Sequence, residues 1–150
     1  MRRTLPPIVL VDNDANDLFL VRWGLEKAGV VNPVVAFTDA EKAREFLAAS
    51  IAPEGGGAAR RPCVIFLDIA MPRRDGFGLL KWARDQGALD ETRLVVLSGS
   101  REPQDRERAV QLGANDYLMK FATTDELADI VGSAKGGCVT SGATAFPRAI

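Results

Sequence analysis

The chain contains no histidine among its 150 residues. Imidazole is the usual general base near neutral pH and the commonest nitrogen ligand of metal ions, so sites of both kinds are excluded. A phosphohistidine formed within the chain is excluded for the same reason. Any phosphoryl group that the protein carries must therefore sit on another type of residue.

The chain also has little net charge, no long apolar run and few cysteines. A formal net charge of −1 does not favour nucleic acid or an anionic membrane as a partner. No apolar run approaches the roughly 20 residues of a membrane span, and the first residues lack the apolar stretch of a secretory signal. We therefore expect a cytoplasmic protein whose two cysteines, Cys63 and Cys138, are reduced thiols.

Short aliphatic runs alternate with helical patterns along the chain. Strands are predicted at 8–11, 34–37, 64–67, 94–97 and 117–119, where the runs are continuous, as is typical of strands buried on both faces. Apolar spacing and capping signals predict helices at 15–28, from the capping box that opens at Thr38, at 77–84, at 105–112 and after Thr123. Five strands alternating with five helices predict an α/β domain with a parallel sheet.

Two segments fall outside this alternation. Residues 52–61 are predicted to form a mobile loop, and residues 136–150 a flexible C-terminal tail after a domain that spans 5–135. No second core and no basic helix–turn–helix pattern follows Lys135. Output is therefore expected through protein contact, not through an attached DNA-binding domain.

Polar side chains stand at the ends of four of the expected strands. Asp12 and Asn13 follow the first strand, Asp68 follows the third, Ser98 ends the fourth and Lys120 follows the fifth. Each alone would suit a turn or a helix cap. Together they should meet at the carboxyl edge of a parallel sheet, where carboxylates suit Mg²⁺ and a lysine and a hydroxyl suit phosphoryl oxygens. The pattern favours phosphoryl transfer onto an aspartate.

Four stretches resemble the receiver domain of two-component response regulators: "IVLVDND", "VIFLDIAMPRRDG", "LVVLSGS" and "GANDYLMK". The third-strand block is the most specific, with Asp68 followed by Met71-Pro72 and Asp75-Gly76. The resemblance implies a flavodoxin-like, doubly wound sheet of five parallel strands in the order 2-1-3-4-5 with five helices. It also implies a stand-alone, single-domain response regulator, which is a signalling domain and not an enzyme that acts on other molecules.

Residue roles follow from this resemblance. Asp68 would be the phosphoacceptor, Lys120 would pair with the phosphoryl group, and Ser98 would bond that group and move toward it. Tyr117 stands at the aromatic switch position of the fifth strand. Mg²⁺ would be held by Asp12, Asn13, Asp68 and the backbone carbonyl of Ala70.

Partners are implied in the same way. The donor would be a histidine kinase or a histidine phosphotransfer protein, docked on the first helix beside Phe19 and Trp23. Those two aromatic residues would also suit a partly buried core. The last two helices and the fifth strand are the face through which a homodimer is expected.

Three departures from the family pattern bear on activity. The family usually has a second acid where this chain has Asn13, so weaker Mg²⁺ binding is expected unless Asp14 restores charge nearby. Phe121 replaces the usual proline after Lys120, so that peptide is either trans, with Lys120 displaced, or cis at a cost of roughly 3 kcal/mol. Ala70 would leave an acyl phosphate open to water, and an Ala70→Asn variant should then lose phosphate more slowly.

Other functions fit parts of the sequence. A receiver-like module could bind partners without phosphate. Asp12-Asn13-Asp14 also fits the D-x-D motif of haloacid-dehalogenase-type phosphatases, with Asp12 as nucleophile, but Asp68 would then have no role. A flavin- or nucleotide-binding domain would need a glycine- or hydroxyl-rich loop after the first strand, where this chain is acidic.

Overall fold

The computed structural model describes residues 5–52, 61–70, 75–134 and 137–139. Five strands form one sheet in the order β2-β1-β3-β4-β5, and every neighbouring pair is parallel. The strands are β1 (Ile8–Val11), β2 (Val34–Phe37), β3 (Val64–Leu67), β4 (Arg93–Ser98) and β5 (Asp116–Met119). The α/β fold class and the strand order 2-1-3-4-5 are thereby confirmed.

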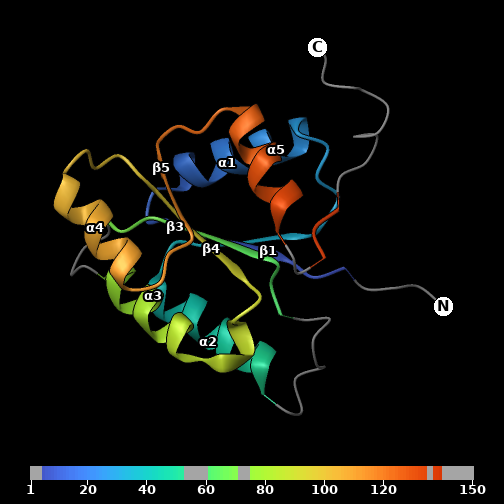
Figure 1. Cartoon of the computed structure of the whole chain (residues 1–150). Coiled ribbons are helices and arrows are strands. Elements are labelled where there is room, and N and C mark those ends of the chain that lie inside the picture. The colour runs from blue at the N-terminus through green and yellow to red at the C-terminus, as the bar shows by residue number, and fades with distance from the viewer. Residues whose placement is uncertain (1–4, 53–60, 71–74, 135–136, 140–150) are drawn as a thin grey trace.

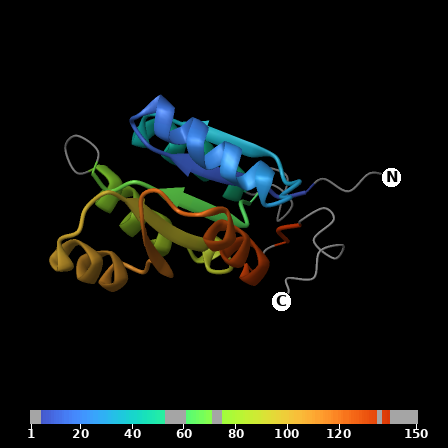
Figure 2. The ribbon, with the colours of Figure 1, turned by 90° about the horizontal axis from the view of Figure 1, so that it is seen from above.

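Helices cover both faces of this sheet (Figure 1). They are α1 (Ala15–Lys27), α2 (Ala40–Ile51), α3 (Asp75–Asp85), α4 (Pro103–Gln111) and α5 (Thr124–Ser133), with a short 3-10 helix, η3 (Gly87–Leu89). Viewed from above, α1 and α5 lie over the strands and α4 lies beside β5 (Figure 2). Within the described residues, no helix is long and apolar enough to cross a membrane.

Two apolar cores lie on opposite faces of the sheet. Successive strand residues point to opposite faces, so each central strand contributes to both cores. Val9, Val11, Ile65 and Leu67 pack in the core beneath α2 and α3, and Ile8, Leu10, Val64 and Phe66 pack in the core beneath α1 and α5. This double burial explains why the strands are continuous aliphatic runs and not alternating patterns.

Helix starts follow from capping side chains. Thr123 and Glu126 form the reciprocal capping box predicted for α5. The capping box predicted to open at Thr38 is wrong. Asp39 is the N-cap of α2, and its carboxylate accepts hydrogen bonds from the backbone amides of Glu41 and Lys42. Helices α3 and α4 begin two residues earlier than predicted. Helix α4 begins with Pro103, and the N–H that proline lacks would have no partner within the first turn of a helix.

The prediction of two reduced thiols is wrong. Cys63 and Cys138 form a disulfide, with their Cα atoms 5.8 Å apart. The fold brings the start of β3 and the segment after α5 to the same place, although 75 residues separate the two cysteines. The prediction rested on the expected redox compartment, which says nothing of this proximity.

Hydrogen bonds hold the segment around Cys138 in place. The side-chain amide nitrogen of Asn32 donates a hydrogen bond to the Gly137 carbonyl at 3.2 Å, and its oxygen accepts one from the backbone amide of Val139 at 2.6 Å. The backbone amide of Val31 donates a hydrogen bond to the Val139 carbonyl at 3.0 Å. Part of the expected flexible tail is therefore docked. Residues 136 and 140–150 of that tail, and residues 53–60 of the expected mobile loop, lie outside the described residues.

The disulfide should stabilise the fold. A Cys138→Ser variant is expected to lose about 2–4 kcal/mol of unfolding free energy, since the crosslink closes a long loop in the unfolded chain. Urea unfolding with and without reductant measures this loss, and the reductant should not affect the variant. Two titratable thiols in the purified, unreduced protein would contradict the crosslink.

Candidate functional site

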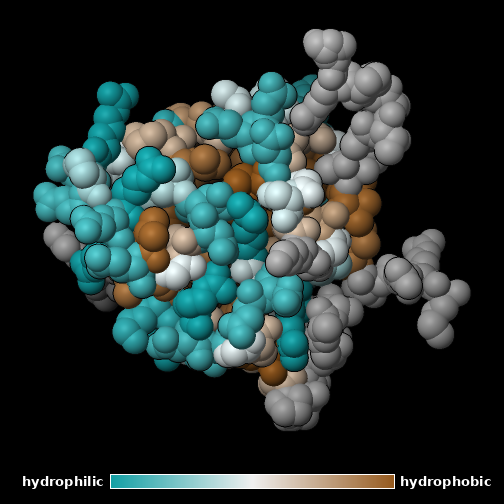
Figure 3. Space-filling model, in the orientation of Figure 1, coloured by the Kyte–Doolittle hydropathy of each residue, from teal (hydrophilic) through white to brown (hydrophobic). Residues whose placement is uncertain are grey.

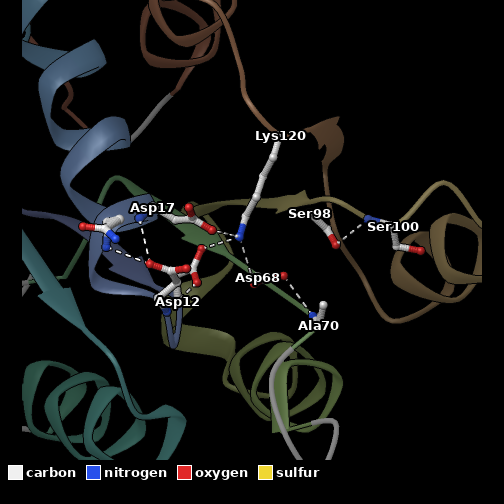
Figure 4. A network of polar contacts seen from close by, with 9 residues as sticks. Asp12, Asp17, Asp68, Ala70, Ser98, Ser100 and Lys120 are labelled. Carbon is white, nitrogen blue, oxygen red and sulfur yellow. Dashed lines mark hydrogen bonds and ion pairs between the residues drawn. The ribbon is translucent and has the colours of Figure 1, made fainter.

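The expected site residues meet at the carboxyl edge of the sheet. Val11 pairs with Leu67 across β1 and β3, so the residues that follow them, Asp12 and Asp68, are neighbours. Both carboxylates are buried, and Ser98 at the end of β4 is fully buried. Figure 4 shows these side chains with Lys120, which follows β5. The prediction that these strand ends converge is confirmed.

The Lys120 ammonium joins three carboxylates. Its Nζ lies 2.7 Å from Asp12 Oδ2, 2.7 Å from Asp17 Oδ2 and 3.1 Å from Asp68 Oδ2 (Figure 4). Only 11% of the lysine side chain is exposed, so water screens these contacts weakly. We call Asp12, Asp17, Asp68 and Lys120 the acid–lysine cluster.

Asp17 is the member of this cluster to which the sequence assigned no role. It lies in the first turn of α1, and its carboxylate reaches back to the strand ends. Asp14, which was expected to restore charge, instead caps α1 by accepting the Asn16 amide at 2.8 Å. Asn13 is exposed. The available signal was the crowding of acids in "DNDAND", which does not reveal which acid points inward.

Burial and ion pairing set the charges of the cluster. Burial raises the pKa of Asp12 above its usual value, although Lys120 and the Asp14 amide oppose that shift. Burial alone would lower the pKa of Lys120, but its hydrogen bonds to the three carboxylates outweigh burial and raise that pKa. Lys120 therefore stays protonated at neutral pH.

The backbone around Asp68 is tightly packed. The Ala70 amide donates to Asp68 Oδ1 at 2.9 Å, which orients the carboxylate. A Cβ on Gly76 would lie 2.5 Å from the Asp68 carbonyl oxygen, so only glycine lets α3 begin this close to β3. Met71 and Pro72, the other part of the predicted motif, lie outside the described residues.

Comparison with known proteins identifies the family. The model of the response regulator receiver domain matches residues 8–132. The chain belongs to this family. Receiver domains are signalling domains that bind Mg²⁺ and are phosphorylated by histidine kinases or phosphotransfer proteins.

Individual relatives agree with this assignment. The bacteriophytochrome response regulator AtBRR is 31% identical with a TM-score of 0.71, and the match covers 87% of this chain and 92% of that chain. The phosphorylated cyanobacterial phytochrome response regulator RcpA is 29% identical with a TM-score of 0.68, covering 84% and 88%. The transcriptional regulatory protein GltR of Pseudomonas aeruginosa is 33% identical over 121 residues, which are 80% of this chain but 45% of GltR.

Ser98 and Tyr117, the two residues expected to act as a switch, both contact the loop after β4. The Ser98 hydroxyl accepts the Ser100 amide at 3.1 Å, and the Tyr117 hydroxyl donates to the Ser100 carbonyl at 3.0 Å. The Ser100 hydroxyl in turn donates to Asp105 Oδ2 in α4 at 2.6 Å. Ser100 was not predicted, yet it joins both expected switch residues to α4.

Two other expectations concern residues beside the cluster. The Lys120–Phe121 peptide is cis, the second of the two alternatives considered.

Phe19 and Trp23 are 64% and 48% exposed, so the alternative in which they form part of the core is wrong. Both lie on α1, the helix that carries Asp17.

The residues of the receiver fit a divalent cation that prefers oxygen. Asp12 and Asp68 offer carboxylate oxygens, Ala70 offers a backbone carbonyl and Asn13 an amide carbonyl, a donor set that suits Mg²⁺ with water completing its shell. Each carboxylate oxygen that bonds Lys120 or a backbone amide keeps a second lone pair. Among the described residues, no three acidic, cysteine or histidine side chains form a metal site by themselves.

Removal of the Lys120 ammonium should destabilise the folded protein. A Lys120→Met variant is expected to lose about 3 kcal/mol of unfolding free energy at pH 7 in metal-free buffer, because buried acids lose their counter-charge. Burial already raises the pKa of Asp12, and without the opposing Lys120 ammonium that pKa in the folded state would lie further above its unfolded value. The folded state would bind more protons, so the loss should shrink as the pH falls to 5.

Urea unfolding at both pH values measures this effect. Lys81→Met is the matched control, since Lys81 forms an exposed pair with Asp85 that contributes little. Equal stabilities for Lys120→Met and the unmodified protein at pH 7 would contradict the role assigned to Lys120.

Proposed function

We propose that this protein is a cytoplasmic response regulator in which Asp68 accepts a phosphoryl group from a partner's phosphohistidine, with Mg²⁺ required. The observation that carries the proposal is the buried Asp68 carboxylate, 3.1 Å from the Lys120 ammonium and beside a second acid, Asp12. Ser98 and Tyr117 then pass the state of Asp68 to a protein-binding surface.

The transfer needs little covalent chemistry from the chain. An Asp68 carboxylate oxygen forms a bond to phosphorus while the bond between phosphorus and the partner's imidazole nitrogen breaks, and the imidazole keeps that electron pair. Lys120 is placed to stabilise the charge on the phosphoryl oxygens. Bound Mg²⁺ would supply further positive charge beside the same oxygens.

The donor is proposed to dock on α1. Phe19, Leu20 and Trp23 are all large, apolar and exposed. Figure 3 shows hydrophobic surface in several separate patches on this face, one of them at the upper left in the region of α1. Aromatic side chains often anchor interfaces. The names of AtBRR and RcpA make a phytochrome-type histidine kinase the first donor to test.

A homodimer is proposed through α4, α5 and β5, including the loop that joins β5 to α5. Val110, Met119 and Phe121 expose apolar surface there.

Sedimentation velocity over a concentration range, with and without phosphorylation, should show a dimer that Val110→Glu weakens. A monomer at every concentration in both states would contradict the proposal.

Phosphorylation is tested directly with a small donor. Incubation with acetyl phosphate and Mg²⁺ should add one phosphoryl group by intact mass, and chelation of Mg²⁺ should prevent it. Asp68→Asn should abolish the gain because the accepting carboxylate is gone. Asp85→Asn, which changes an exposed aspartate in α3, should leave it intact.

Two other results would select other functions. No gain at any concentration of donor or Mg²⁺ would favour a receiver that binds partners without phosphate. A gain that survives Asp68→Asn but is lost in Asp12→Asn would indicate phosphatase-like chemistry with Asp12 as nucleophile.

A further inference from the structure

Asp17 is the acid of the acid–lysine cluster to which the sequence assigned no role. This acid lies in the first turn of α1, its side chain is 18% exposed, and its Oδ2 lies as close to Lys120 Nζ as Asp12 Oδ2 does, at 2.7 Å. We propose that Asp17 is a positioning residue that supplies the second acid of the site, in place of the acid missing at Asn13. The inference rests on the proposed function, since it concerns the same phosphoacceptor site.

The charge balance of the acid–lysine cluster supports this role. Asp12, Asp17 and Asp68 in their ionised forms carry three negative charges, and Lys120 carries one positive charge. The cluster then has a formal charge of −2, which one divalent cation neutralises. Without Asp17 the charge would be −1, and a divalent cation would be held less strongly.

The neighbouring polar residues cannot take this role. Asn13 is exposed and uncharged, and its side chain forms no hydrogen bond with the described part of the chain. The Asp14 carboxylate accepts the Asn16 amide at 2.8 Å and the Asp17 amide at 3.4 Å, so it caps α1 and does not bond Lys120. In this chain the second acid has moved from the strand end to the helix that follows.

A purely structural role makes a different prediction. If Asp17 only ties α1 to Lys120, its loss would lower stability, and an acid at position 13 would not repair the defect. If Asp17 supplies charge to the site, an acid at position 13 should replace it. The Asn13→Asp change therefore separates the two roles, and the two positions form a double-mutant cycle.

The experiment is a calorimetric titration of the unphosphorylated protein with MgCl₂. Asp17→Asn should weaken Mg²⁺ binding about tenfold, the lower end of the effect usual for residues that support metal ligands. Asn13→Asp should restore affinity in the Asp17→Asn background and strengthen it less in the unmodified background. Glu26→Gln, which removes an exposed acid from the same helix, should bind Mg²⁺ like the unmodified protein.

The other outcomes overturn the inference. Unchanged affinity in Asp17→Asn, or weakened affinity that Asn13→Asp does not restore, would mean that Asp17 does not supply the second acid. If the Asp17→Asn variant does not fold, the Asn13→Asp variant decides by itself. A gain of tenfold or more in its Mg²⁺ affinity over the unmodified protein would show that the unmodified site still lacks a second acid, which would overturn the inference. The proposed function would survive these results if the unmodified protein binds Mg²⁺ and is phosphorylated on Asp68. It would fail as well if the unmodified protein did neither.

Discussion

The ion pairs of Lys120 are the interaction on which this site depends. Asp12 and Asp68 are buried side by side, and like charges repel strongly where water is scarce. A single ammonium, within 3.1 Å of both and of Asp17, compensates that repulsion and holds together β1, β3, β5 and α1. The same Lys120 ammonium that offsets the repulsion between the carboxylates lies where it can bind a phosphoryl group on Asp68. Lys120 is therefore expected to serve both the stability of the fold and the proposed phosphoryl transfer.

The fold separates this site from the crosslink. Strand β3 begins next to Cys63 and ends next to Asp68, so the disulfide and the proposed phosphoacceptor lie at opposite ends of one buried strand. Parallel strands bring their carboxyl ends to one edge, where polar side chains can meet without entering either apolar core. The segment at Gly137–Val139 docks on the other edge, through Asn32 and Cys63.

Much of this could be predicted from the sequence because the relevant signals are local. The aliphatic runs fix the strands, and the polar residues directly after them, Asp12, Asp68 and Lys120, must meet once the strands are parallel. The strand order came from resemblance, since periodicity does not specify neighbours. Asp17 and the disulfide could not be predicted, because each contact depends on how α1 or the segment after α5 packs against a distant strand. Likewise, Thr38 and Asp39 both suit a helix cap, and only packing selects Asp39.

The most direct test of the central claim is chemical mapping of the phosphorylated residue in the unmodified protein. After phosphorylation in Mg²⁺, borohydride reduction converts an aspartyl phosphate to homoserine, which peptide mass spectrometry locates. Homoserine at position 68 alone is the predicted result. Homoserine at position 12, or at no position in a protein that has gained phosphate, would contradict the assignment of Asp68 as the phosphoacceptor.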